Sequence, residues 1–140
     1  MKRKASAEWS GGLKDGKGTV STDSGILSGT SYSFTTRFED EPGTNPEELI
    51  AAAHAGCFTM ALSGQLGNRG MTAESIKTTA TLTMDKLEAG WTVTAIHLDV
   101  AAKIPGADQA KFDEAANAAK NGCPISRLLN TNITMEARLA

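Results

Sequence analysis

Hydrophobic and polar positions alternate in the N-terminal part of the chain, and this alternation predicts short strands. The clearest alternation runs over 31–38, where every second residue is aromatic or Thr and Arg37 falls on the opposite face. The segments 18–22 and 25–28 are rich in Thr, Ser and Gly, which is typical of short antiparallel strands joined by a tight turn. We therefore expect the chain to begin as a β-sheet.

The next pattern predicts a long helix that begins after Asn45. Asn45 suits the N-cap, Pro46 suits the first helical position, and the carboxylate of Glu48 can reach back to the cap. Small and apolar residues then recur at three- and four-residue steps. The residues on this stripe are Ile50, Ala53, Cys57, Met60, Ala61 and Gly64. We expect a central buried helix whose small side chains let another helix or chain approach closely.

The second half of the chain predicts strands and helices in a mixed order. Alternating apolar positions indicate strands over 72–84 and 91–104, which Ala89-Gly90 joins as a hairpin, and a final strand over 133–139. An Ala-rich amphipathic pattern predicts a helix over 107–120, and a short helix follows over 123–129. Strands, helix, strands, helices and strand in that order favour an α+β fold over alternating βαβ units.

Composition narrows the functional classes. The 140 residues carry 14 Lys+Arg and 16 Asp+Glu, a formal net charge of −2, and the length suits a single domain over residues 1–140. This balance lacks the basic footprint of a nucleic-acid binder. No apolar run approaches the ~18–20 residues of a membrane span, and no apolar stretch follows the basic N-terminus. We expect no membrane or nucleic-acid partner and a reducing, cytoplasmic location.

The chain has two cysteines, Cys57 and Cys123, and the thiolate is the reactive form of each. Cys123 directly precedes Pro124 at a predicted helix start, where free backbone N–H groups would stabilise a thiolate. Cys57 lies inside the predicted long helix, where burial would raise its pKa unless a cation reaches it. Local physics therefore favours Cys123 as the activated thiol, and Cys57 is interpreted first as a small packing residue.

Other ionisable residues have both a structural and a functional interpretation. His54 precedes Cys57 by three residues and shares its helix face, but a core histidine would show the same pattern. His54, His97 and the two cysteines together have the residue types of a zinc site. However, the chain has no C-x-x-C clamp and His97 falls on the polar face of its strand, so zinc is a weak alternative.

Two segments, 43–58 and 122–126, resemble the OsmC/Ohr family, the osmotically inducible protein C and organic hydroperoxide resistance proteins. The first contains Asn-Pro-Glu-Glu and His-Ala-Gly-Cys-Phe, and the second contains Gly-Cys-Pro. The likeness extends over nearly the whole chain, and the His-Ala-Gly-Cys-Phe segment is closer to the OsmC branch. The resemblance implies an OsmC-like fold with antiparallel β-sheets around a central buried helix. It also implies an intertwined homodimer with active sites at the subunit interface.

The resemblance further implies a cysteine-based peroxidase acting on organic hydroperoxides, with hydrogen peroxide as a second candidate substrate. Cys57 matches the peroxidatic cysteine that becomes a sulfenic acid, and Cys123 matches the resolving cysteine that forms a disulfide with it. An external thiol or dithiol, with a dihydrolipoyl protein as one candidate, would restore both thiols. No metal, flavin or haem cofactor is implied.

Arg37 and Glu47 match the charged pair that activates the first thiol in the family. The family resemblance therefore makes Cys57 the activated thiol, whereas local physics alone favours Cys123. A guanidinium beside Cys57 would stabilise its thiolate, and Glu47 would hold that guanidinium in a bidentate pair. Glu47 and Cys57 lie ten residues apart, or about 15 Å along a helix. The side chain of Arg37 can reach both only if it lies along the helix or if the first turn of the helix bends away.

A non-catalytic dimeric redox sensor or ligand-binding protein, whose thiols only pack, is the alternative.

Overall fold

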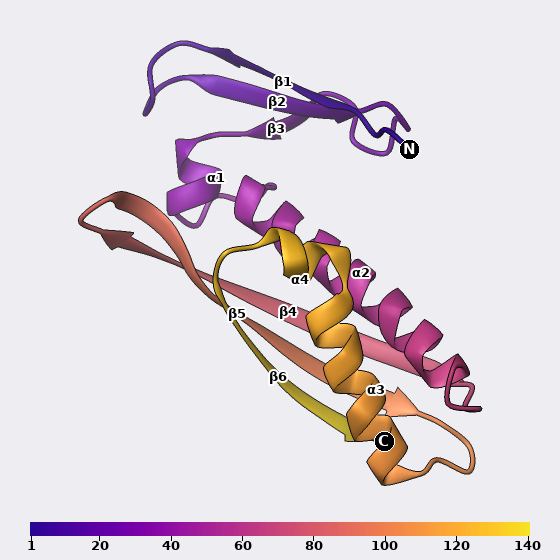
Figure 1. The fold of residues 1–140 in the computed structure, drawn as a ribbon. Helices are drawn as coiled ribbons and strands as arrows, with labels where there is room; N and C mark the ends of the chain where they lie inside the picture. The colour runs from indigo at the N-terminus through magenta and orange to yellow at the C-terminus, as the bar shows by residue number, and fades with distance from the viewer. The chain divides into compact units, whose positions relative to one another are not determined.

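The computed structural model describes all 140 residues and divides them into two compact units, Met1–Leu49 and Ile50–Ala140. The boundary between the units falls within the first turn of the longest helix. The elements, in chain order, are β1 (Ala5–Ser10), β2 (Lys17–Thr22), β3 (Thr30–Tyr32), α1 (Phe34–Phe38), α2 (Pro46–Gly67), β4 (Ser75–Leu87), β5 (Gly90–Lys103), α3 (Gln109–Gly122), α4 (Pro124–Leu128) and β6 (Asn132–Leu139) (Figure 1). The expected α+β class is confirmed.

The first unit contains a three-stranded antiparallel sheet in the order β1-β2-β3. The rings of Trp9 and Tyr32 pack across it with their centroids 5.5 Å apart. All six residues of β1 are exposed, so this strand has no buried face within the chain. The predicted strand over 25–28 is wrong, because this segment forms a turn in which Gly25 takes a positive φ of 77°.

The predicted strand over 31–38 is also wrong, because the chain leaves β3 at Tyr32 and forms α1 instead. Ser33 and Thr36 form a capping box that starts the helix. The N–H of Thr36 donates to Oγ of Ser33 at 3.2 Å, and the N–H of Ser33 donates to Oγ1 of Thr36 at 2.8 Å. This reciprocal pair stabilises a helix start that hydrophobic alternation does not reveal.

Helix α2 begins as the sequence predicts, with Oδ1 of Asn45 accepting the N–H of Glu48 at 2.8 Å. The expected return contact from the Glu48 carboxylate to the cap is absent, because that carboxylate accepts Oγ1–H of Thr44 at 2.9 Å instead. The buried residues of α2 recur every four positions: His54, Phe58, Leu62 and Leu66. The predicted stripe is therefore on the wrong side, and Met60 on it is 80% exposed. Within this chain α2 is buried along one face only.

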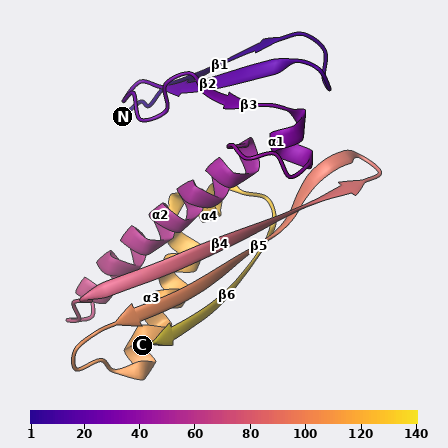
Figure 2. The same ribbon diagram turned by 180° about the vertical axis from the view of Figure 1, so that it is seen from behind.

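The second unit is a three-stranded sheet, β4-β5-β6, with α2 and α3 packed on one face (Figure 2). Strands β4 and β5 form the expected antiparallel hairpin, but β6 pairs with β5 in parallel. The all-antiparallel expectation is thus wrong, since α3 and α4 form the crossover that returns the chain to the parallel edge. The core side chains are Phe58, Leu62, Leu66, Met71, Ile96, Leu98, Val100, Ala102, Ile104, Phe112, Ala115, Ala116, Ala119 and Cys123.

Helix α2 also meets the length and composition criteria of a membrane span, with a mean hydropathy of 1.3 over its best 18-residue window. This corrects the expectation that no segment approaches the required length. The core helix of a soluble protein meets the same criteria, and α2 contributes Phe58, Leu62 and Leu66 to the hydrophobic core. The helix is therefore only weak support for a membrane location.

Candidate active site

Helices α2 and α4 bring the two cysteines into contact. Cys57 is half-buried on α2, Cys123 is fully buried as the N-cap of α4, and both thiols are free. The Cys57 thiol donates a hydrogen bond to the sulfur of Cys123, and the backbone N–H of Ile125 donates to the sulfur of Cys57. Two residues far apart in the sequence, one on α2 and one at the start of α4, thus form a thiol pair. The two helices lie side by side in Figures 1 and 2.

The surroundings of Cys57 favour its neutral form. Burial is the largest cause that raises the pKa of the Cys57 thiol, and its hydrogen bond to Cys123 raises the pKa further. The N–H of Ile125 lowers this pKa, but the net direction is upward. The expectation that burial raises the Cys57 pKa is confirmed. A reactive thiolate at this position therefore requires a positive charge from another residue.

A second contact joins the same two helices beside the thiols. Nε2 of His54 lies 2.7 Å from Oγ of Ser126, at full burial of the histidine and 8% exposure of the serine. Burial lowers the pKa of His54 below its usual 6.5, so the ring is neutral at pH 7. The other ring nitrogen, Nδ1, is buried without a hydrogen-bond partner. The sequence pattern indicated His54 as a candidate but not Ser126 or Ile125. The available signal was that both residues follow Cys123 within the first turn of α4.

Arg37 and Glu47 form a multiply bonded ion pair in the Met1–Leu49 unit. Nε of Arg37 donates to Oε1 and Oε2 of Glu47 at 2.9 and 3.1 Å, and Nη2 donates to Oε1 at 2.6 Å. The guanidinium also lies over the ring of Phe38, 5.1 Å from its centroid. The expectation that Arg37 points away from the aromatic residues is wrong, because 34–38 is helical. These contacts fix the orientation of the guanidinium.

The residues weighed for zinc do not converge. His97 lies on the exposed face of β5, where its Nδ1 is 2.7 Å from Oγ1 of Thr134 on β6. No group of three or more His, Cys, Asp or Glu side chains is arranged to hold a metal ion. The structure therefore gives the zinc alternative no support.

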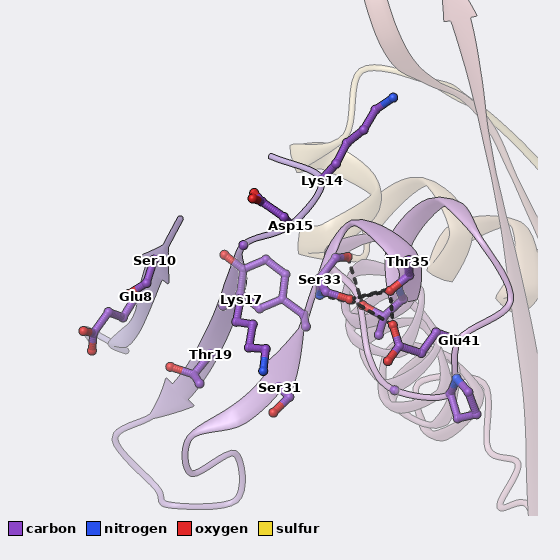
Figure 3. Close-up of a pocket in the computed structure, with 16 residues that line it drawn as sticks. Glu8, Ser10, Lys14, Asp15, Lys17, Thr19, Ser31, Ser33, Thr35 and Glu41 are labelled. Carbon is purple, nitrogen blue, oxygen red and sulfur yellow. Dashed lines mark hydrogen bonds between the residues drawn. The ribbon is translucent and has the colours of Figure 1, made fainter. Parts of the chain in front are cut away.

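A cavity of about 740 Å³ lies within the Met1–Leu49 unit (Figure 3). Its lining carries charges of both signs, including Glu8, Lys14, Lys17 and Glu41, and the hydroxyls of Ser33 and Thr35 donate to Glu41. None of the four candidate residues, Cys57, Cys123, Arg37 and Glu47, contributes to this lining. A second, more open cavity of about 650 Å³ lies between α2 and β4, next to Gly56 and Met60. The thiol pair therefore lines neither cavity.

Comparisons with known proteins give consistent matches. A family model described as OsmC-like protein matches residues 38–138. The chain is 52% identical over 137 residues to Peroxiredoxin OsmC of Escherichia coli K12, covering 98% of this chain and 96% of that protein. It is 30% identical over 123 residues to the organic hydroperoxide resistance protein OhrB of Bacillus subtilis, covering 87% and 88%. The solved structure of OhrB matches with a TM-score of 0.74 at 25% identity, covering 96% and 98% of the two chains. An OsmC-like protein of Vibrio cholerae matches in fold, with a TM-score of 0.79 at 18% identity.

Proposed function

The chain belongs to the OsmC-like protein family, and from this membership we propose that it is a cysteine-based peroxidase that reduces hydroperoxides. Identity of 52% to a peroxiredoxin over nearly the full length of both chains supports this function. The observation that carries it is the contact between two free thiols, Cys57 and Cys123. A peroxidase that forms an intramolecular disulfide needs such a pair, because each thiol contributes one sulfur to the bond.

The proposed reaction has two steps on the protein. The Cys57 thiolate attacks one oxygen of the hydroperoxide, the O–O bond breaks, and the other oxygen leaves with a proton as an alcohol or water. Cys57 is thereby oxidised to a sulfenic acid. The sulfur of Cys123 then attacks that of Cys57, the S–O bond breaks, and the hydroxyl leaves with the Cys123 proton as water. The resulting disulfide is reduced by an external thiol or dithiol, for which a dihydrolipoyl protein is the candidate.

Arg37 is the residue that we propose for activating Cys57. Burial raises the pKa of Cys57, so a nearby cation is needed to keep the sulfur ionised at neutral pH. Arg37 is permanently charged, and its guanidinium is held by Glu47. Since α2 is one continuous helix, Glu47 and Cys57 are separated by about 15 Å along its axis. We therefore assign the activating guanidinium to the second copy of the chain in a homodimer.

The proposed homodimer has support of its own from exposed apolar residues. Met60 on α2 is 80% exposed, and every residue of β1, including Trp9 at 37%, is exposed. The exposed side of α2 around Met60 consists largely of small residues: Ala52, Ala53, Gly56, Ser63 and Gly64. Small side chains allow a second helix to pack closely, and burying this face would remove apolar surface from water.

Two variants, each expected to be inactive as a homodimer, test the proposed dimer and its shared site together. Arg37→Ala and Cys57→Ser chains, carrying different affinity tags, are co-expressed and the mixed dimer is purified. If Arg37 acts across the interface, the mixed dimer regains one functional site, which combines Cys57 of one chain with Arg37 of the other. If Arg37 acts within its own chain, the mixed dimer is as inactive as either parent. A tagged wild-type dimer is the control for purification.

The peroxidase function itself is tested by thiol titration and turnover. Reduced protein is treated with one equivalent of cumene hydroperoxide, and loss of both thiols is expected. Steady-state consumption of alkyl hydroperoxide and of hydrogen peroxide is then measured with dihydrolipoamide and with thioredoxin as donors. Retention of both thiols, with no consumption of either peroxide, would favour the alternative of a dimeric binding protein whose thiols only pack. Loss of the thiols without turnover by either donor would favour a redox sensor.

A further inference from the structure

His54 and Ser126 form a second contact between α2 and α4, beside the contact between the thiols. His54 precedes Cys57 by three residues, and Ser126 follows Cys123 by three residues, so each lies one helical turn from its cysteine. The distance of 2.7 Å between Nε2 and Oγ is that of a good hydrogen bond. The two helices are therefore joined at two adjacent points, one of which carries the reacting sulfurs.

The short helix α4 has few other means of keeping its place. It is five residues long, and Ser126 is its only buried residue, while Leu128 is 72% exposed. Its N-cap, Cys123, makes no side-chain capping hydrogen bond. Ile125 packs only partly against the core. The hydrogen bond to α2 is accordingly the main polar interaction of the α4 side chains.

Burying the polar ring of His54 is unfavourable in free energy, and Ser126 is its one polar partner. The ring is fully buried and its Nδ1 has no partner, which is unfavourable for a polar atom in a core. A leucine at this position would fill the space without that penalty. The contribution that a leucine could not make is the hydrogen bond between Nε2 and Oγ of Ser126.

We propose that His54 is a positioning residue for the formation of the disulfide, and this rests on the proposed peroxidase function. Its hydrogen bond to Ser126 holds α4 against α2, so that the sulfur of Cys123 meets the sulfenic acid of Cys57. In that step the S–O bond of Cys57 breaks, the S–S bond forms, and the hydroxyl and the Cys123 proton leave together as water. His54 and Ser126 exchange no electrons in it.

The expected effect is selective for the second step. In Ser126→Ala, disulfide formation slows roughly tenfold, which corresponds to about 1.4 kcal/mol, the worth of one buried hydrogen bond. The first step, measured as hydroperoxide consumed in a single turnover, keeps its rate. Under excess hydroperoxide the longer-lived sulfenic acid reacts again, so more Cys57 reaches the sulfinic state.

Matched variants separate positioning from simple packing. His54→Gln places an amide nitrogen about as far along the side chain as Nε2 and keeps the rate of disulfide formation near that of the wild type. His54→Asn is shorter, cannot reach Ser126, and slows disulfide formation as Ser126→Ala does. Ser126→Thr retains the hydroxyl and restores the rate. Thr79→Ala, which removes an exposed hydroxyl on β4 away from both helices, is the control and leaves both steps unchanged.

The experiment is a single turnover of each reduced variant with one equivalent of cumene hydroperoxide, quenched in acid and read by intact mass. Loss of two hydrogens reports the disulfide, and one or two added oxygens report the sulfenic and sulfinic acids. Equal disulfide rates in Ser126→Ala and wild type would overturn the proposal, as would equal slowing of both steps alongside a fall in thermal stability. If wild-type protein consumes no hydroperoxide, the peroxidase function itself fails, which the wild-type sample shows directly.

Discussion

The ion pair between Arg37 and Glu47 can be removed with a single change that leaves shape nearly constant, Glu47→Gln. Oε1 of Glu47 accepts from both Nε and Nη2 of Arg37, and Oε2 accepts from Nε, so the variant loses the negative charge and the Oε2 contact and keeps only hydrogen bonds from the guanidinium to an uncharged amide oxygen. The side chain of Glu47 is 14% exposed and that of Arg37 is 37% exposed. Breaking a buried ion pair costs about 3–5 kcal/mol, and a surface pair contributes about 0.2–1 kcal/mol. Because both side chains are partly exposed, we expect the cost for this pair to lie near the surface value.

We expect Glu47→Gln to lower the free energy of unfolding by about 1 kcal/mol, equivalent to a fall in Tm of roughly 3–5 °C. Activity falls further, because a guanidinium without its carboxylate no longer has one defined orientation. A reduction of about tenfold in kcat/KM with cumene hydroperoxide follows if about 1.4 kcal/mol of thiolate stabilisation is lost. The assays are thermal unfolding by circular dichroism and steady-state hydroperoxide consumption.

Glu48→Gln is the matched control for this change. Glu48 is the adjacent carboxylate in the same first turn of α2, and both carboxylates interact favourably with the positive end of the helix. Glu48 bonds to Thr44 and not to Arg37, so its loss leaves kcat/KM unchanged. Equal kcat/KM values in Glu47→Gln and Glu48→Gln would refute the role assigned to the ion pair.

Three further outcomes are expected. Cys57→Ser abolishes hydroperoxide consumption, and wild-type turnover in this variant would count decisively against the reaction scheme. Cys123→Ser allows one rapid stoichiometric turnover and then lets Cys57 over-oxidise, which intact mass would contradict by showing no added oxygen. Because burial lowers the pKa of His54 below 6.5, the unfolded state binds a proton more readily than the folded state. The stability that neutral, buried His54 contributes is therefore full above pH 6.5 and is lost as the pH falls toward the lowered pKa. Chemical denaturation at several pH values measures this slope, and the same slope in His54→Gln would disprove the prediction.

Some elements were predictable because their signals are local. The cap at Asn45, the hairpin of β4 and β5, and the short helix at Pro124 each depend on residues within a few positions of one another. The buried alternation of β5 was also readable, since a half-buried strand repeats every two residues. All of these are features of local structure, which residue propensities and the hydrophobic pattern determine.

Other features were not predictable because they depend on distant partners or on hydroxyl groups. The alternation at 31–38 gave way to α1 because Ser33 and Thr36 form a capping box. The parallel pairing of β6 depends on the path of the crossover, which the strand's own pattern does not encode. The buried face of α2 follows the sheet and α3, and this tertiary packing moved it to His54 and Phe58.

The features of the candidate site also fall into those with local sequence signals and those that depend on distant partners. The residue types for thiol chemistry were evident, and burial of Cys57 was correctly expected to raise its pKa. Local physics alone ranked Cys123 first, because nothing in the spacing shows that the two thiols touch. Ser126 escaped notice because a serine in a short helix is unremarkable until its partner is known.

The alkylation rate of Cys57 as a function of pH tests the central claim most directly. The measurement uses the Cys123→Ser background, in which Cys57 is the only thiol, with and without Arg37→Ala. If the guanidinium keeps the sulfur ionised, removing it shifts the midpoint of the alkylation curve to higher pH, because burial is then unopposed. Superimposable curves for the two proteins would contradict the account.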